Sequence, residues 1–114
     1  MPKKGRSGED AAASYLEEKG IKILEKNFRS RIGEIDIIAL DGDTLIFVEV
    51  KNWSFYGVDA LEYAIDAKKR HKIIETSKYF LSLHREYRYM AIRFDVILVS
   101  SGITHLASAF TELV

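Results

Sequence analysis

The feature that most constrains the fold is a pair of β-branched segments joined by a short turn signal. Residues 33–40 and 44–51 are rich in isoleucine and valine, which favour strands. Between them, Asp41-Gly42-Asp43 is typical of a hairpin turn. Apolar residues occupy neighbouring positions in both segments. We therefore expect this hairpin at the centre of a sheet rather than at its edge.

The flanking sequence predicts helices before and after the hairpin. Ser7 and Asp10 resemble a capping box for a helix over about residues 8–19, which Gly20 would end. Asp66 is a candidate cap for a second helix that runs to about residue 84. The other predicted elements are strands over 21–28, 92–100 and 103–107, a short helix over 60–65 and a helical turn over 109–113. The order αβββαβ predicts an α/β fold with a mixed central sheet flanked by helices.

Length and composition indicate one domain over residues 1–114, in which residues 1–6 form a flexible tail. No segment approaches the roughly 20 apolar residues that span a bilayer. The basic start of the chain has no apolar stretch behind it, so we expect a cytoplasmic protein without a membrane partner. The absence of cysteine excludes disulfides and thiolate chemistry.

Charge is unevenly spread along a chain whose net charge is zero. Residues 32–65 carry 1 basic and 7 acidic side chains, whereas residues 66–93 carry 8 basic and 3 acidic ones. An acidic segment beside a basic one can hold a metal ion next to a polyanion. Solvation of surface helices explains the same pattern equally well.

The hairpin carries the residues with the clearest chemistry. The two-residue period of strands puts Glu49 and Lys51 on one face, and either two-residue turn puts Asp36 on the same face. A turn at Gly42-Asp43 sets Asp36 directly opposite Glu49, whereas a turn one residue earlier sets it diagonally. Two such carboxylates repel each other, and Mg²⁺ or Mn²⁺ would relieve the repulsion.

Lys51 could then hold an attacking water or stabilise charge that develops on phosphorus. The three residues therefore indicate metal-assisted hydrolysis of a phosphodiester. The alternative is a solvated strand face with an ordinary Glu–Lys pair.

Further charged residues are candidates for binding. Lys69 and Lys72 on the second helix, and Arg29 and Arg31 before the hairpin, could contact a nucleic-acid backbone. Their alternatives are a solvated helix face and a loop ion pair. Glu34 is either an outer metal ligand or an exposed carboxylate.

Asp95 lies in the predicted strand over 92–100, on the face opposite Phe94. We expect it to form an ion pair with an arginine rather than to act in catalysis.

The ordered set of residues resembles the PD-(D/E)XK nuclease superfamily, in which Asp36 and the later Glu49-Val50-Lys51 match the signature on a hairpin after an initial helix. More narrowly, the chain resembles the YraN-like family of bacterial endonucleases over nearly its whole length. The matching residues are Gly8-Glu9, Ala12, Tyr15-Leu16, Asn27-Phe28-Arg29, Gly33-Glu34-Ile35-Asp36, Phe47-Val48-Glu49-Val50-Lys51, Lys69, His71-Lys72, Arg93-Phe94-Asp95-Val96 and Ala109-Phe110.

The resemblance implies a restriction-endonuclease-like core and a catalytic set. Asp36 and Glu49 would be metal ligands and Lys51 the catalytic lysine. Glu9 matches a first-helix glutamate that the similar archaeal Holliday-junction resolvases also place at the metal site. One departure is that Asn52-Trp53 stands where the family usually has Thr-Arg after the lysine.

The function implied is a metal-dependent endonuclease that hydrolyses DNA in repair or recombination. Mg²⁺ would be the cofactor, Mn²⁺ could substitute, and no organic cofactor is expected. DNA would be the partner, and the related resolvases suggest a homodimer. Two alternatives stay open: a resolvase specific for Holliday junctions or flaps, and a nucleic-acid-binding module of nuclease-like fold that does not cleave.

Overall fold

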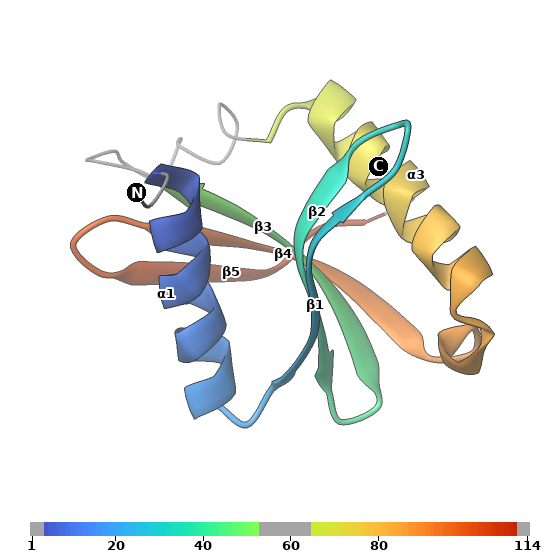
Figure 1. The fold of residues 1–114 in the computed structure, drawn as a ribbon, viewed down its shortest axis with the longest axis horizontal. Helices are drawn as coiled ribbons and strands as arrows, with labels where there is room; N and C mark the ends of the chain where they lie inside the picture. Colours follow the sequence, from blue (N-terminus) through green and yellow to red (C-terminus); the bar gives the residue numbers. More distant parts are fainter. Residues whose placement is uncertain (1–3, 53–64, 112–114) are drawn as a thin grey trace.

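The computed structural model, which describes residues 4–52 and 65–111, has a five-stranded sheet between two helices (Figure 1). In chain order the elements are α1 (Lys4–Glu18), β1 (Lys22–Arg29), β2 (Glu34–Asp41), β3 (Thr44–Asn52), α3 (Ala67–Leu83), the 3₁₀ turn η1 (Arg85–Tyr87), β4 (Ala91–Val99) and β5 (Ile103–Phe110). The α/β class and the αβββαβ order are confirmed.

The sheet is mixed, as expected, with the strand order β1-β2-β3-β4-β5. Only β3 and β4 are parallel, because the chain crosses from one to the other through α3. The other neighbouring strands are antiparallel. This order puts the β2–β3 hairpin in the middle of the sheet, where its apolar sequence predicts it.

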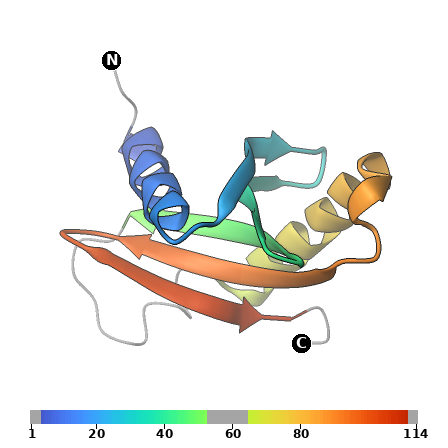
Figure 2. The ribbon, with the colours of Figure 1, turned by 90° about the horizontal axis from the view of Figure 1, so that it is seen from below.

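Each helix covers one face of the sheet (Figures 1 and 2). Leu16 of α1 packs in a buried cluster with Ile46 and Val48 of β3. Phe47, which points to the other face, packs on Phe80 of α3 with ring centroids 5.9 Å apart. The side chains of β3 therefore alternate between the two faces as predicted. Glu49 and Lys51, two and four residues after Phe47, lie on the same face as Phe47, toward α3.

The turn between β2 and β3 has the first of the two predicted registers. Asp41 pairs with Thr44, so Gly42-Asp43 forms a two-residue turn. Gly42 has a φ of 59°, which glycine adopts without steric cost. The alternative turn one residue earlier is excluded.

Helix α1 ends as predicted but begins earlier. The amide of Gly20, whose φ is 83°, donates to Glu17, and the amide of Ile21 donates to Leu16, both at 3.0 Å. This pair of hydrogen bonds is a Schellman motif, which satisfies the last carbonyls of the helix. At the other end α1 begins at Lys4, so the predicted start near residue 8 is wrong and Ser7 lies inside the helix. No proline interrupts residues 4–7, and a serine–aspartate spacing alone does not stop a helix.

Helix α3 begins where the sequence predicts it, because the side chain of Asp66 accepts a hydrogen bond from the Lys69 amide at 2.9 Å. The predicted helical turn from residue 109 is wrong at its start, since β5 continues to Phe110. Phe110 stacks on Phe94 of β4 with ring centroids 5.1 Å apart, and this contact keeps the chain extended. The rest of that turn after residue 111, and residues 60–64 of the predicted short helix, lie outside the described residues.

Within residues 4–52 and 65–111, neither helix is long and apolar enough to cross a membrane.

A buried ion-pair network joins β4, β5 and α1. Asp95 is fully buried and accepts two hydrogen bonds from the Arg93 guanidinium, at 2.9 and 3.0 Å. His105 Nε2 lies 2.7 Å from the same carboxylate, and the Ser108 amide donates to it at 3.0 Å. The other ring nitrogen of His105 lies 3.0 Å from the Tyr15 hydroxyl of α1. The predicted ion pair of Asp95 with an arginine is confirmed.

We expect Asp95→Ala to lower the free energy of unfolding by roughly 3–5 kcal/mol, because it leaves Arg93 without its buried partner. Urea unfolding followed by circular dichroism measures this. Asp10→Ala, which removes an exposed ion pair with Lys26, is the control and should cost less than about 1 kcal/mol. Equal losses in the two variants would contradict a structural role for the Asp95 network.

Candidate active site

Strand β2 separates from β3 at Asp36. The last backbone pair between the two strands on this side is Ile37–Val48. One residue further, the Asp36 carboxylate accepts a hydrogen bond from the Val50 amide at 2.8 Å. The remainder of β2 follows β1 instead, through the pairs Ile35–Phe28 and Glu34–Arg29. In Figure 1 the start of β2 and the end of β3 diverge accordingly, so Asp36 lies where the sheet forks.

Asn27 of β1 lies opposite Asp36 and has an unusual backbone. It stands between the pairs Lys26–Ile37 and Phe28–Ile35, and its φ of 56° is in the left-handed region, which asparagine tolerates better than most residues. The side chains of Asn27 and Asp36 both lie within hydrogen-bonding reach of Glu9 on α1. The structure therefore brings Glu9 to Asp36, as the resemblance implies.

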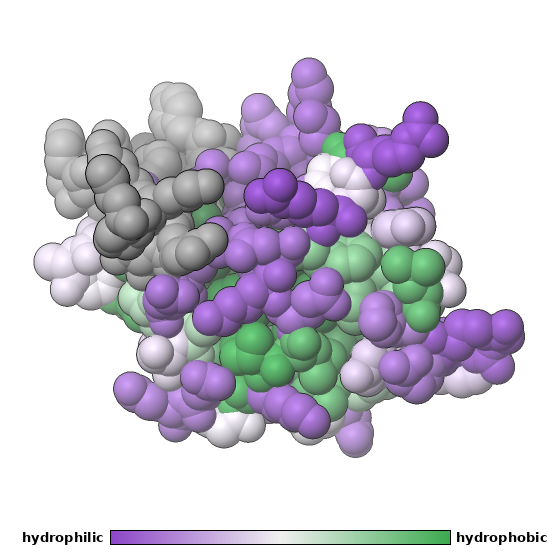
Figure 3. Space-filling view, viewed as in Figure 1, coloured by the Kyte–Doolittle hydropathy of each residue, from purple (hydrophilic) through white to green (hydrophobic). Residues whose placement is uncertain are grey.

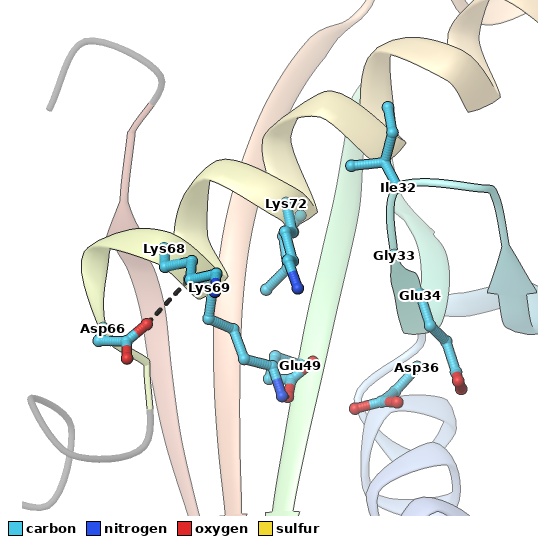
Figure 4. Close-up of a pocket in the computed structure, with 10 residues that line it drawn as sticks. Ile32, Gly33, Glu34, Asp36, Glu49, Asp66, Lys68, Lys69 and Lys72 are labelled. Atoms are coloured by element: carbon cyan, nitrogen blue, oxygen red, sulfur yellow. Dashed lines mark hydrogen bonds and ion pairs between the residues drawn. The ribbon is translucent and has the colours of Figure 1, made fainter.

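The fork opens into a pocket of about 430 Å³ (Figure 4). Carboxylates of β2 and β3 line one side, and lysines at the start of α3 line the other. These residues are Glu34, Asp36 and Glu49 on the acidic side and Lys68, Lys69 and Lys72 on the basic side. Figure 3 shows hydrophilic side chains over the upper part of β2 and the first turns of α3 on this face of the molecule.

Glu49 is the least exposed of the three acidic residues on the acidic side of the pocket. Its side chain is only 5% exposed, and Lys69 Nζ lies 2.8 Å from one carboxylate oxygen. Lys51 Nζ, on the same strand face, lies 3.9 Å from the same oxygen. Lys69, predicted to contact a phosphate backbone, thus forms an ion pair with the predicted metal ligand, while Lys72 lines the pocket nearby.

Burial and the charge of Glu49 raise the pKa of Asp36 to about 8. The Val50 amide opposes this shift, and the negative charge of Glu9 adds to it. Burial also raises the pKa of Glu9, although a hydrogen bond with Asn27 opposes the increase, and the charge of Glu34 reinforces it. Burial and neighbouring negative charge therefore both make it harder for the carboxyl groups of Asp36 and Glu9 to lose their protons.

The two lysines differ in how firmly they hold their protons. Burial lowers the pKa of Lys51, and the neighbouring Lys69 lowers it further. Burial acts in the same direction on Lys69, but its hydrogen bond and charge interaction with Glu49 outweigh that effect and raise its pKa. Lys69 therefore holds its proton more firmly than Lys51 does.

The acidic side chains fit a hard divalent cation. In the part of the chain that the structure describes, no three His, Cys, Asp or Glu side chains are already arranged around one metal position. Mg²⁺ does not need such a cage, because it keeps several waters and binds proteins through one or two carboxylates. Burial raises the pKa of Asp36 and of Glu9, and the neighbouring carboxylates raise both further. A bound cation would offset both effects, because it favours the charged form of each carboxylate.

Arg29 and Arg31 do not line the acidic pocket. Together with Ser30, Ile32 and Tyr79 they line a second pocket of about 680 Å³. The Arg29 guanidinium also lies 3.4 Å from the Glu34 carboxylate. This is the ion pair that the sequence offered as the alternative to nucleic-acid binding by Arg29. Glu34 itself is partly buried and lines the acidic pocket, so it lies where an outer ligand would.

Two positioning residues were not predicted from sequence. Asn27 was recognised only as part of a motif, and its signal was an asparagine inside a predicted strand, where asparagine is depleted. Gly8 packs so closely on Asn52 that a Cβ would collide with the Asn52 side chain. This contact seats α1 on the end of β3, directly before Glu9 and directly after Lys51. The departure from the family pattern at Asn52 therefore lies at a packing contact.

The raised pKa of Asp36 predicts a pH-dependent stability. Between about pH 4 and 8 the folded protein retains a proton that the unfolded chain releases near its ordinary pKa of 3.8. Without divalent metal, the free energy of unfolding should therefore fall as pH rises through this range. One pKa unit corresponds to about 1.4 kcal/mol. Near pH 8 the free energy of unfolding of Asp36→Asn should therefore exceed that of the wild type by more than about 1 kcal/mol.

Urea unfolding at a series of pH values measures both effects, with Asp43→Asn in the exposed turn as control. If Asp36→Asn were less stable than the wild type near pH 8, the raised pKa of Asp36 would be refuted.

A family profile and related sequences from several bacteria match the chain. The profile described as "Uncharacterised protein family UPF0102" matches residues 8–99. A UPF0102 protein of Persephonella marina is 47% identical over 108 residues, which is 94% of this chain and 92% of that protein. UPF0102 proteins of Treponema denticola and Clostridioides difficile are 43% and 46% identical and cover 98% and 94% of this chain, and 98% and 96% of their own lengths. The matched region includes Glu9, Asp36, Glu49, Lys51 and Lys69. The chain belongs to the UPF0102 family, which is the YraN-like family that its motifs resemble.

Proposed function

We propose that this protein is a Mg²⁺-dependent endonuclease that hydrolyses phosphodiester bonds of DNA. The observation that supports this most directly is the acidic pocket, which has a volume of about 430 Å³. Asp36 and Glu49 line it together with the lysines of α3. One side of the pocket is suited to a metal ion and the other to the phosphates beside it. The resemblance to PD-(D/E)XK nucleases assigns the same residues to the same chemistry.

In this proposal Asp36, Glu49 and Glu9 hold the metal ion, for which Mn²⁺ can substitute. An ion held by these carboxylates would neutralise charge on the phosphate and would activate the attacking water. Asp36 is held in position by the Val50 amide, so its carboxylate does not need to reorganise when a substrate arrives.

The lysines have separate roles. Lys51, whose pKa is lowered by burial and by Lys69, donates a hydrogen bond to the attacked phosphate and stabilises its developing charge. Lys69 orients Glu49 through their 2.8 Å ion pair. Lys72, one turn along α3, binds a neighbouring phosphate.

We propose that the protein acts in DNA repair or recombination and that it forms a homodimer. Both proposals rest on the resemblance to the nuclease and resolvase families alone. Two copies would bring two acidic pockets to one DNA molecule, so that both strands could be cut in one encounter. A solution mass twice that of the 13.0 kDa chain would support the dimer.

We expect the wild type to cut DNA with Mg²⁺ or Mn²⁺ and not with EDTA. Asp36→Asn, Glu49→Gln and Lys51→Ala should each reduce the rate roughly a hundredfold or more, the usual loss when a group that stabilises a transition state is removed. The measurement is gel analysis of labelled linear, flapped and four-way-junction DNA. Lys22→Ala and Asp43→Asn, at exposed positions outside the pocket, are the matched controls. Cleavage that survives in all three pocket variants would refute the assignment.

A nucleic-acid-binding module that does not cleave is the second candidate. The close ion pair between Lys69 and Glu49 favours it, because an ammonium group already satisfies one of the proposed ligands. Metal binding by itself separates the two candidates, since a module of this kind needs no metal.

Mg²⁺ should therefore raise the melting temperature of the wild type by several degrees. At a hundredfold excess over its Kd, a ligand stabilises the folded state by about 2.7 kcal/mol. Scanning calorimetry at constant ionic strength, with NaCl in place of MgCl₂ as control, measures the shift. Asp36→Asn should lose most of it, and an identical shift in that variant would place the metal elsewhere.

A further inference from the structure

The second pocket lies between the β1–β2 loop and α3. It has a volume of about 680 Å³ and is lined by Arg29, Ser30, Arg31, Ile32 and Tyr79. Ile32 lines the acidic pocket as well, so the two pockets are neighbours separated by one side chain. Figure 4 shows Ile32 at the head of the loop that leads through Gly33 and Glu34 to Asp36.

The loop that carries Ile32 is held in place by Ser30 and α3. The Ser30 hydroxyl accepts hydrogen bonds from the amides of Ile32 and Gly33, at 3.1 and 3.2 Å. The same hydroxyl lies 3.2 Å from the Thr76 hydroxyl of α3. Gly33 packs against Lys72 and Thr76 of the same helix. The loop therefore presents its tip at a defined place, and its exposed side chains are positioned in advance of any ligand.

The pocket combines two apolar surfaces with positive charge. Ile32 is 46% exposed and Tyr79 is 45% exposed, although both are large apolar or aromatic residues. The Tyr79 ring rests on the buried Phe28 ring, with centroids 6.0 Å apart. Arg31 and Arg29 add positive charge to the lining, and the exposed guanidinium of Arg29 also forms the 3.4 Å ion pair with Glu34. An aromatic face beside arginines matches a nucleotide, since the ring stacks on the base and the arginines bind phosphate.

The spacing along α3 relates the second pocket to the acidic one. Tyr79 follows Lys72 by seven residues, which is two helical turns on one face and about 10 Å along the axis. That distance corresponds to about three stacked nucleotides of one strand. A strand whose phosphate lies in the acidic pocket can therefore reach Tyr79 within a few nucleotides.

We propose that the second pocket binds the base of an unpaired nucleotide of the substrate strand, close to the bond that is cut. The preferred substrate is then a forked duplex, in which one strand continues beyond the last base pair. In a continuous duplex every base is paired and stacked, so none can reach Tyr79 without being extruded. Ile32 lies between the two pockets, where it packs against the last base pair as an apolar wedge. This inference rests on the proposed function for the identity of the polymer as DNA.

The test measures binding rather than cleavage. Fluorescence anisotropy in EDTA compares a forked duplex with a continuous duplex of the same sequence, so that no strand is cut. We expect the wild type to bind the fork about 5- to 100-fold more tightly, the range for one base–aromatic stack. In Tyr79→Ala the ratio of the two affinities should fall toward one, whereas Tyr79→Phe, which keeps the ring, should retain it.

Tyr89→Ala is the matched control, because Tyr89 is 88% exposed and lines neither pocket. A 2-aminopurine base in the unpaired arm supplies a second readout. Stacking on Tyr79 should quench its fluorescence in the wild type and in Tyr79→Phe, but not in Tyr79→Ala. Equal binding of fork and duplex by the wild type, or a fork preference that persists in Tyr79→Ala, would overturn the inference.

The outcomes also separate this inference from the proposed function. A fork preference that depends on Tyr79, without cleavage under any metal condition, supports the pocket and refutes the endonuclease. Cleavage that requires Asp36 and Lys51, with equal rates on fork and duplex and equal binding, supports the endonuclease and refutes the pocket.

Discussion

The hydrogen bond from the Val50 amide to the Asp36 carboxylate is the contact on which the site depends. It replaces a backbone pair at the point where β2 leaves β3, so the sheet opens there while the two strands stay connected. Asp36 is thereby fixed in a partly buried position beside Glu49 and Glu9. Its pKa rises to about 8 because burial and those neighbouring charges disfavour the carboxylate. The same fork creates the pocket that receives the lysines of α3.

Stability and proposed activity therefore oppose each other at the fork. A partly buried carboxylate with a raised pKa makes the folded state less stable near neutral pH than a well-paired hydrophobic strand would at the same position. Other contacts stabilise the rest of the fold. The Asp95 carboxylate interacts with Arg93, His105 and the Ser108 amide. The aromatic cluster around Phe80 packs α3 on the sheet. These contacts stabilise the frame that keeps the acidic residues of the fork close together.

Much of the fold followed from local sequence. The Gly42-Asp43 turn, the alternation along β3 and the Asp66 cap were all predicted, because each depends on residues within a few positions of one another. The predicted start of α1 and the predicted end of β5 were wrong. Nothing in residues 4–7 stops the helix from beginning before residue 8, and the end of β5 depends on the stacking of Phe110 on Phe94 of another strand.

The sequence by itself determined that Asp36, Glu49 and Lys51 share one strand face, since the turn register and the two-residue period decide it. Only the tertiary structure decided which residues join them. Lys69 reached Glu49 because α3 crosses over that face, and Glu9 reached Asp36 because α1 rests on the end of β3 through Gly8. Arg29 and Arg31, close to the hairpin in sequence, were directed into a second pocket by the Ser30 loop. Such placements depend on packing between segments far apart in the chain, which no local pattern encodes.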